Sequence, residues 1–280
     1  MCQLKKKIKY LIQNIVVIFK GKKIVPVLVT KDESKVLEGK VALITGGSGG
    51  IGFAIAKKYN ECGCKVILAG TNKEKLENNC NKLEEAKCLI LDYKKSDNFE
   101  EKITEAVNIF GKIDILVSSS GVHTDYSGFD WSKVTEDDYD HVMDINLKGT
   151  YFLIQKFAKY LVQNNSKGHI LVISSSRGLE PSWSPYRLSK LGTDGIVKGF
   201  AQQLLPYGII VNAIGPGSTA TAMQESTVKE SIYTSDSLIE RMTLPEEIAE
   251  FAKLMVIGAG DLIVGQTVYL SSGRGIIDLR

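Results

Sequence analysis

The chain has 280 residues, and its 44% hydrophobic and 24% charged content is that of an ordinary soluble globular protein with a sizeable core. Its 35 basic and 32 acidic side chains leave a net charge of only +3, which excludes a strong overall field for nucleic acid. The five cysteines form no CxxC pair and no cluster with histidines, which favours a reduced cytoplasmic protein without metal over a metal or redox pair at Cys62 and Cys64.

The first 37 residues are predicted to be a basic extension of the main domain. Seven lysines and no acid lie between residues 1 and 23. Apolar residues recur there at helical spacing, so we expect an amphipathic helix within residues 4–23. Its apolar side would pack on the body or a sister subunit, or rest on the inner face of an anionic membrane. The polar interruptions make it too short to span a bilayer, and no signal-peptide cleavage site follows.

From Lys40 onward, apolar strand-like runs alternate with helical patterns. The predicted strands are 41–45, 65–69, 88–91, 113–117, 169–173, 209–213 and 265–270. The predicted helices are 51–61, 73–85, 97–110, 135–163, 185–205 and 245–257. Near-continuous apolar strands separated by helices predict an α/β fold, a doubly wound Rossmann-type parallel sheet with helices on both faces. Residues 38–280 are therefore expected to form a single domain.

A glycine-rich turn joins the first predicted strand to the first helix. Residues 45–52 read Thr-Gly-Gly-Ser-Gly-Gly-Ile-Gly, and without Cβ atoms the backbone there can turn sharply and approach a pyrophosphate. The strand-turn-helix setting makes this a predicted dinucleotide site. The residues expected to contact the cofactor are Gly46, Ser48, Gly49, Gly50, Ile51 and Gly52.

The end of the second strand bears on the choice of cofactor. An acid there would bond the adenosine ribose and repel a 2′-phosphate, but this chain has Gly-Thr-Asn-Lys at 70–73. Thr71 and Asn72 offer hydrogen-bonding groups, and Lys73 offers a positive charge unless it is a surface residue at a helix start. NADP(H) is therefore favoured, with NAD(H) as the alternative. Asp92, just past the third strand, is either a partner for the adenine amino group or a turn acid.

Tyr186 and Lys190 are four residues apart in a predicted helix, which places both side chains on one face. An ammonium beside a phenol favours the ionised phenol and so suits proton transfer. Over residues 38–275 the chain resembles the classical short-chain dehydrogenase/reductase family. The resemblance rests on the turn at 45–52, Asn146 in Asn-Leu-Lys-Gly, Ser175 in Ile-Ser-Ser-x-x-Gly, the Tyr-x-x-x-Lys pair, and Pro216 with Gly217.

The resemblance implies a catalytic tetrad. Tyr186 would be the acid in carbonyl reduction and the base in alcohol oxidation. Lys190 would lower the pKa of that phenol and hold the nicotinamide ribose, and Ser175 would bond the substrate oxygen. Asn146 would hold a water that relays protons to Lys190. The resemblance also implies cofactor contacts from Ser119, Gly121, Tyr186, Lys190, Pro216, Gly217, Thr219 and Thr221. It further implies a homodimer or homotetramer formed through the helices at 135–163 and 185–205.

Two departures from the family pattern bear on the cofactor pocket. Residues 118–121 read Ser-Ser-Ser-Gly where the family has Asn-Asn-Ala-Gly. This change removes amides that brace the sheet, and we expect weaker cofactor binding from it. Residues 270–273 read Leu-Ser-Ser-Gly where the family has Asp-Gly-Gly, which changes that edge of the pocket.

The substrate is expected to lie between a lid at 222–244, containing Met223, Tyr233 and Met242, and a wall at 123–131. Trp183 either faces the substrate or packs on its loop. Neither segment contains an arginine cluster that would indicate a phosphate or acyl-carrier partner. The leading hypothesis is a carbonyl reductase or alcohol dehydrogenase, of the 3-oxoacyl-thioester reductase kind. The alternatives are a silent nucleotide-binding scaffold or sensor, and a membrane-surface reductase of a lipid-like substrate.

Overall fold

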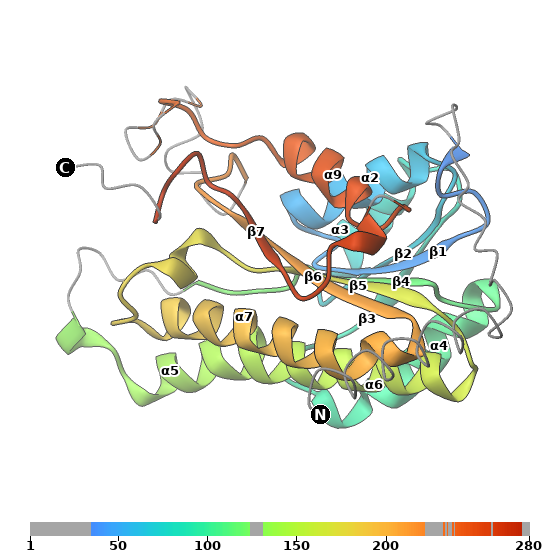
Figure 1. Ribbon diagram of the computed structural model, residues 1–280, viewed down its shortest axis with the longest axis horizontal. Helices are drawn as coiled ribbons and strands as arrows, with labels where there is room; N and C mark the ends of the chain where they lie inside the picture. The colour runs from blue at the N-terminus through green and yellow to red at the C-terminus, as the bar shows by residue number, and fades with distance from the viewer. Residues whose placement is uncertain are drawn as a thin grey trace, which may run out of the picture. The chain divides into compact units, whose positions relative to one another are not determined.

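Seven strands form one parallel sheet in the order β3-β2-β1-β4-β5-β6-β7, as the computed structural model in Figure 1 shows. The strands are β1 (Val41–Thr45), β2 (Lys65–Gly70), β3 (Ala86–Ile90), β4 (Ile115–Ser118), β5 (Gly168–Ile173), β6 (Ile209–Pro216) and β7 (Thr267–Leu270). The order reverses between β1 and β4, and doubly wound sheets bind ligands at such a switch point. The predicted fold class is confirmed.

The sheet belongs to the unit formed by residues 32–280. The structure describes residues 35–123, 131–221, 232, 234, 237, 239–258 and 260–275. The predicted helix within 4–23, most of the 123–131 wall, and Met223 and Tyr233 of the lid lie outside these residues. Leu37, which the sequence assigned to the extension, is buried in the core of this unit, and the boundary at 37 stays a prediction. No helix among the described residues has the length and apolar character needed to cross a bilayer.

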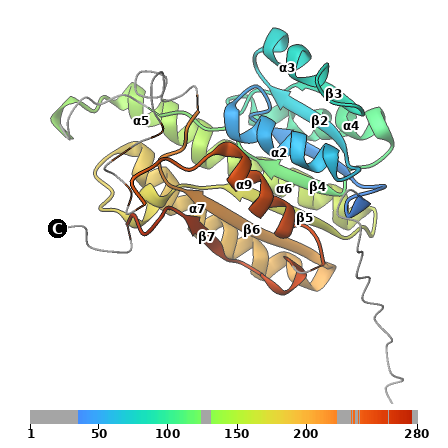
Figure 2. The ribbon, with the colours of Figure 1, turned by 90° about the horizontal axis from the view of Figure 1, so that it is seen from above.

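Helices cover both faces of the sheet, as Figures 1 and 2 show. On one face lie α2 (Gly50–Glu61), α3 (Lys73–Cys80) and α9 (Pro245–Leu254). On the other lie α4 (Phe99–Phe110), α6 (Thr150–Gln163) and α7 (Pro185–Leu204), with α5 (Glu136–Met143) leading into α6. The predicted helix at 73–85 ends early, at Cys80, in a segment rich in asparagine, which is a weak helix former.

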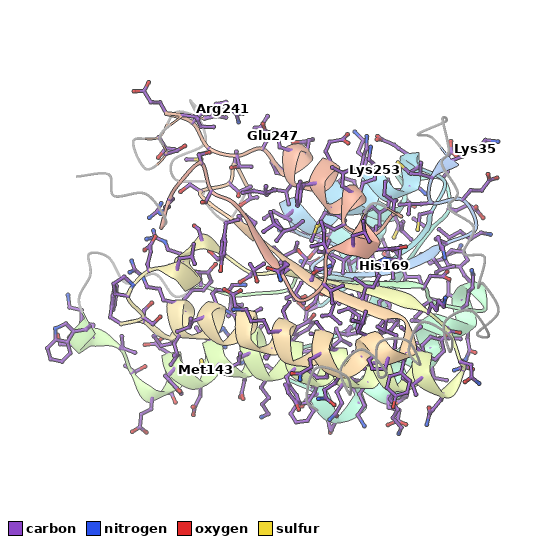
Figure 3. All side chains as sticks on the ribbon, viewed as in Figure 1. Lys35, Met143, His169, Arg241, Glu247 and Lys253 are labelled. Atoms are coloured by element: carbon purple, nitrogen blue, oxygen red, sulfur yellow. The ribbon has the colours of Figure 1, made fainter. Side chains whose placement is uncertain are left out.

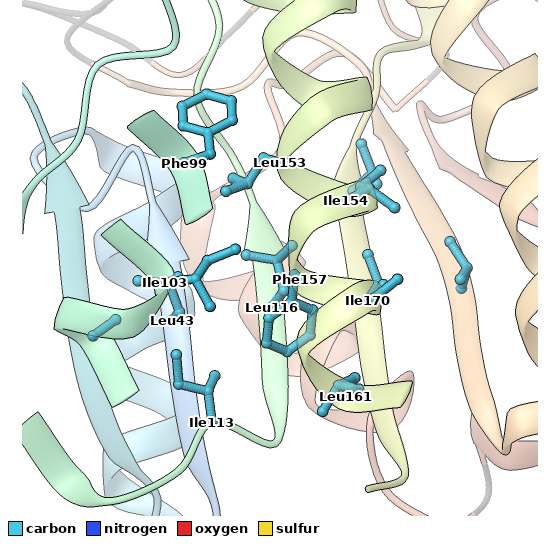
Figure 4. Packing of buried hydrophobic residues seen from close by; sticks show 14 of the residues in the cluster. Leu43, Phe99, Ile103, Ile113, Leu116, Leu153, Ile154, Phe157, Leu161 and Ile170 are labelled. Atoms are coloured by element: carbon cyan, nitrogen blue, oxygen red, sulfur yellow. The ribbon is translucent and has the colours of Figure 1, made fainter. Parts of the chain in front are cut away.

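Each face of the sheet has its own hydrophobic core because side chains alternate along a strand. In β1, Val41 and Leu43 point to the face of α4 and α6, while Ala42 and Ile44 point to that of α2 and α9. Figure 4 shows the first core, in which Phe157 of α6 packs among residues of the strands and of α4. This two-sided burial explains why the strands read as continuous apolar runs.

Cys62 and Cys64, the candidate metal or redox pair, are both buried in the second core. Burial raises the pKa of the Cys64 thiol to about 12, so the reactive thiolate is strongly disfavoured. Among the described residues, no group of three or more His, Cys, Asp or Glu side chains gathers as a metal site would require.

An ion pair fixes the start of α9, where Figure 3 shows Arg241 and Glu247 close together. Arg241 contacts both carboxylate oxygens of Glu247, at 2.8 and 2.6 Å. The same carboxylate accepts a hydrogen bond from the Leu244 backbone at 2.8 Å, and these donors lower its pKa to about 2. Met242, which the sequence placed in the lid, is buried. The last part of the predicted lid is therefore held to the body through α9.

The stretch predicted as one long helix at 135–163 is helical from Glu136 to Gln163, but its middle is a π-helical turn. A π-helical turn, Asp144–Gly149, separates α5 from α6. Gly149 lies against the ring of Tyr93, where an added Cβ would stand 2.6 Å from a ring carbon. Periodicity could not reveal the break, because a π-turn adds a single residue to an otherwise helical run. The break includes Asn146, one of the candidate catalytic residues.

Candidate functional site

A cavity of about 560 Å³ opens at the carboxyl ends of the strands. Segments that follow β1, β4, β5 and β6 line it, together with the starts of α2, α3 and α7. The predicted site residues that line it are Gly46, Ser48, Gly49, Gly50, Ile51, Gly52, Asn72, Ser119, Gly121, Ser175, Tyr186, Lys190, Pro216, Gly217, Thr219 and Thr221. Thr71, Asp92 and Asn146 are not among its lining residues.

The glycine turn brings the start of α2 to the cavity. Gly46 has a φ of +66°, which favours glycine. A Cβ at Gly52 would collide with the Gly46 carbonyl oxygen, and one at Gly50 would stand 2.8 Å from the Thr221 methyl group. No acidic residue occupies the first turn of α2, and no side chain caps its N-terminus. Free amides at a helix start suit a phosphate, so the turn fits a dinucleotide pyrophosphate.

A lysine at the start of α3 lines the cavity, but it is not the lysine that the sequence predicted. Lys73 is exposed and lies 3.7 Å from Glu77. The Asn72 side-chain oxygen caps α3 by accepting a hydrogen bond from the Lys75 backbone at 2.9 Å. Lys75, two residues after Lys73, lines the cavity together with Asn72 and Ser48. Among the described residues, no Asp or Glu lines the cavity.

Asp92 makes a local turn contact. Its carboxylate accepts a hydrogen bond from the Lys94 backbone at 3.0 Å. This geometry agrees with the turn-acid alternative. Thr71 is exposed at the surface.

Tyr186, Ser175 and Lys190 meet at the other end of the cavity. Ser184 caps α7 and Pro185 opens it, so Tyr186 stands in the first helical turn. The Ser175 hydroxyl is near enough to the phenol to lower its pKa. The Lys190 ammonium is buried, lies 5.7 Å from the centre of the Tyr186 ring, and donates to the Ile173 carbonyl at 3.1 Å. The predicted helical face thus brings the two side chains to one place.

The electrostatics differ from the expectation that Lys190 lowers the pKa of the phenol. Burial raises the pKa of Tyr186, and the Ser175 hydrogen bond and the charge of Arg177 act in the opposite direction. Burial also lowers the pKa of Lys190 to about 8, although the negative charge of the nearby Asp194 carboxylate acts to raise it. Arg177, which sequence reasoning missed, therefore joins the groups that favour the tyrosinate.

Asn146 lies behind the cavity wall. Its side-chain oxygen accepts from the Val122 backbone at 2.8 Å, and its amide donates to the Val122 carbonyl at 2.9 Å and to Ser189 at 3.2 Å. A Cβ at Gly121 would stand 3.3 Å from the Asn146 oxygen and 3.7 Å from the Lys190 ammonium. The amide of Asn146 thus fixes the segment that separates it from Lys190.

A tyrosine braces the serine segment that follows β4. The buried Tyr93 hydroxyl lies 2.8 Å from the Thr45 hydroxyl and 2.9 Å from that of Ser118. The Thr45 hydroxyl in turn accepts from the backbones of Ser119 and Ser120, at 3.0 and 3.3 Å. The expected loss of bracing is therefore offset by a phenol from the chain after β3. A lone tyrosine past a strand gave no sequence signal for this role.

The segment after β6 closes the cavity. The Gly217 backbone donates to the Leu270 carbonyl at 3.0 Å, and the Thr219 hydroxyl donates to the Gly217 carbonyl at 3.0 Å. Ser271 packs against Gly217, where an added Cβ would stand 3.0 Å from the Ser271 Cα. The changed sequence at 270–273 thus forms a packed edge.

Sequence reasoning missed several lining residues. They are Lys75, Ser120, Val122, Ile173 and Ser174. Three of these, Ser120, Val122 and Ser174, adjoin residues that were chosen, and extending each motif by one position would have found them. His123 was placed in the substrate wall, and its ring centre lies 4.6 Å from that of Tyr186.

Known proteins resemble the chain in sequence and in fold. The family model for short chain dehydrogenases matches residues 40–231. A 3-oxoacyl-(acyl-carrier-protein) reductase of Rickettsia felis is 32% identical over 245 residues, covering 85% of this chain and 97% of that protein. A 3-ketoacyl-(acyl-carrier-protein) reductase from Brucella melitensis, solved with NADH, has a TM-score of 0.75 and 26% identity, covering 86% and 100% of the two chains. An actinorhodin polyketide ketoreductase solved with NADPH has a TM-score of 0.77 and 25% identity, covering 85% and 98%.

Proposed function

Because the chain belongs to the short-chain dehydrogenase/reductase family, we propose that Tyr186, Ser175 and Lys190 act directly in its reaction and that NADP(H) is preferred. The chain is an NAD(P)(H)-dependent oxidoreductase that moves hydride between a nicotinamide and a carbonyl or secondary alcohol. One observation supports these residue roles: the three side chains line the same cavity as the glycine turn.

The bound nicotinamide would supply the hydride in reduction and accept it in oxidation. In reduction, the Tyr186 phenol would give its proton to the carbonyl oxygen of the substrate. The Ser175 hydroxyl, which lines the same cavity near that phenol, would donate to the same oxygen and stabilise the charge that develops there. The charge of Arg177 would favour the tyrosinate that remains. The Lys190 ammonium, held by the Ile173 carbonyl, would offer its other protons to the cofactor ribose.

Asn146 would support the proton path by holding the backbone around it in position. Its amide is committed to Val122 and Ser189, so the side chain fixes the π-helical turn beside Lys190. A water held at this turn would return a proton to the tyrosinate through the ammonium. π-turns are frequent at functional sites, which fits this role.

The preference for NADP(H) rests on the charge at the end of β2. Lys75 lines the cavity with Ser48 and Asn72, and no carboxylate among the described residues opposes a 2′-phosphate there. An ammonium and two small polar groups can bind that phosphate. We expect wild-type protein to bind NADPH more tightly than NADH.

Titrating the full chain with NADPH and NADH, followed by nicotinamide fluorescence, tests the cofactor proposal. Lys75→Gln should weaken NADPH binding about 10-fold, the usual scale for a charge-assisted contact, and leave NADH binding unchanged. Lys73→Gln is the matched control, since Lys73 pairs with Glu77 instead. Preference for NADH in the wild type would refute the proposal. Binding of neither cofactor would favour the scaffold alternative.

The proposed substrate class is a ketone or a 3-oxoacyl thioester, the latter because the Rickettsia and Brucella proteins carry that activity in their names. Tyr186→Phe should abolish NADPH oxidation with such substrates while NADPH still binds. Turnover equal to that of the wild type in Tyr186→Phe would show that the phenol is not the proton donor.

We also propose a homodimer or homotetramer that uses α6 and α7. Tyr151, Leu188 and Leu191 expose apolar side chains on these helices. The rings of Tyr151 and Phe200 lie 5.1 Å apart and join the two helices at the surface. Light scattering should give a multiple of the chain mass for the wild type and a smaller species for Leu191→Glu. A monomeric wild type would refute this.

A further inference from the structure

Three arginines from different segments meet at one carboxylate beside the site. Arg177 lies in the 3-10 turn Ser176–Leu179, Arg187 in the first turn of α7, and Arg274 after β7. One oxygen of Glu180 lies 2.7 Å from Arg177 and 2.9 Å from Arg187, and the other lies 3.0 Å from Arg274. The segments 123–131 and 222–244 contain no such cluster, so the fold creates it from elsewhere in the chain.

The cluster is built rigidly. The side chains of Arg187, Arg274 and Glu180 are only 9%, 15% and 15% exposed. Arg187 also donates to the Pro181 carbonyl at 3.1 Å, and its guanidinium lies 5.6 Å from the centre of the Trp183 ring. Trp183 thus packs against Arg187, in agreement with the loop-packing alternative. Groups held in this way present a fixed charge with little loss of side-chain freedom.

Arg177 is the arginine of the three that can contact a ligand. Arg187 and Arg274 already contact both oxygens of Glu180, and Arg177 is the third cation on that carboxylate. It is also the most exposed of the three, at 30%. A guanidinium has five N–H donors, and the bond to Glu180 uses the Nη1 atom alone. The remaining donors suit a second, planar anion.

Arg177 is held in position by Ser175, the residue expected to form a hydrogen bond with the substrate oxygen. Its backbone N–H donates to the Ser175 hydroxyl at 3.2 Å, so the two residues share one turn. Its charge is close enough to lower the pKa of Tyr186. On the far side, Arg274 donates to the Ser218 hydroxyl at 3.1 Å, next to Gly217 of the cavity lining. The cluster therefore borders the end of the cavity where the carbonyl would react.

We infer that Arg177 binds a carboxylate or phosphate group of the carbonyl substrate, while Glu180, Arg187 and Arg274 hold Arg177 in place. The inference rests on the proposed reductase function and narrows its substrate class to anionic ketones. Glu180 takes up one N–H group of Arg177, and a guanidinium that is already held in place can bind a planar anion through its remaining donors with little loss of side-chain freedom.

Two matched pairs of ketones test the inference with the full chain and NADPH. Acetoacetate is compared with methyl acetoacetate, and dihydroxyacetone phosphate with dihydroxyacetone. The wild type should favour the charged member of at least one pair, and the favoured pair tells carboxylate from phosphate. Arg177→Gln should lower kcat/KM for that member by about 10- to 100-fold, the scale of a lost charge-assisted contact, and change the uncharged member less than 2-fold. Arg177→Lys should retain part of the preference.

Lys102→Gln is the control, since this lysine pairs with Glu105 on α4, away from the cavity, and should leave both members of each pair unchanged. Equal loss for charged and uncharged ketones in Arg177→Gln would overturn the anion site and leave the reductase function standing. If none of the four ketones reacts, calorimetric titration of the NADP⁺ complex with acetoacetate and dihydroxyacetone phosphate decides. The inference is overturned if the wild type binds neither anion, or if Arg177→Gln binds the anion as tightly as the wild type does. Failure of NADPH itself to bind would instead overturn the proposed function.

Discussion

The hydroxyl of Tyr93 lies 2.8 Å from that of Thr45, at the carboxyl end of β1. Thr45 precedes the glycine turn and also holds the backbone of the segment after β4. Through this contact, a residue that follows β3 supports both walls of the cofactor cavity. The bond is buried, so its loss leaves polar groups without water to replace it.

Tyr93→Phe removes this support without changing ring packing. We expect the KM for NADPH to rise about 3- to 10-fold and the free energy of unfolding to fall by about 1 kcal/mol, the usual scale for one buried hydrogen bond. Steady-state kinetics and urea unfolding measure the two effects. Tyr160→Phe is the control, because its hydroxyl accepts from the Ile113 backbone at 3.3 Å, before β4 begins. A KM increase of the same size in both variants would show that the effect on Tyr93 is only general destabilisation.

Asp194 is predicted to keep Lys190 protonated. Its carboxylate accepts hydrogen bonds from Ser174 at 2.9 Å and from Thr267 at 3.0 Å, and also from Tyr269. Its charge raises the pKa of Lys190, which burial has lowered to about 8. In Asp194→Asn the pKa of Lys190 should fall further, because the negative charge is gone.

The measurement for Asp194→Asn is the pH profile of turnover. If the reaction needs the ammonium, activity falls as pH rises through the pKa of Lys190, so the alkaline limb should move to lower pH in this variant. Glu105→Gln, which breaks a surface pair with Lys102 on α4, should leave the limb in place. An unchanged limb in Asp194→Asn would argue against this electrostatic role.

Gly52→Ala should disrupt the cofactor turn. The added Cβ would collide with the Gly46 carbonyl, so the turn must shift. We expect more than a 10-fold loss of NADPH affinity by fluorescence titration. Gly258→Ala, after α9, is the control, since nothing lies within 4 Å of its added Cβ. It should keep full affinity. Full affinity in Gly52→Ala would contradict the proposed role of the turn.

Phe157→Ala tests the core between the sheet and α6. The ring is fully buried among the residues shown in Figure 4. Truncation should reduce the free energy of unfolding by about 3–5 kcal/mol, the range for large-to-small changes in a core. Urea unfolding measures it. Leu262→Ala, at a side chain that is 91% exposed, should change stability by less than about 0.5 kcal/mol.

The sequence by itself determined the order of strands and helices and the positions of the main motifs. Apolar runs and helical periodicity are local, so they predicted the seven strands near their observed bounds. The glycine turn is also local, because Gly46 and Gly52 belong to one short loop. Tyr186 and Lys190 were predictable as neighbours because helical spacing alone puts them on one face.

Only the tertiary structure decided which distant residues meet. It placed Lys75 instead of Lys73 at the cavity, joined Tyr93 to Thr45, interrupted the long helix at Asn146, and gathered Arg177, Arg187 and Arg274 around Glu180. These three arginines come from segments up to 97 residues apart in the sequence, so no local pattern links them. Their meeting depends on how the loops at the carboxyl ends of β5, β6 and β7 pack together, and the free energy of that packing belongs to the whole fold rather than to any one segment.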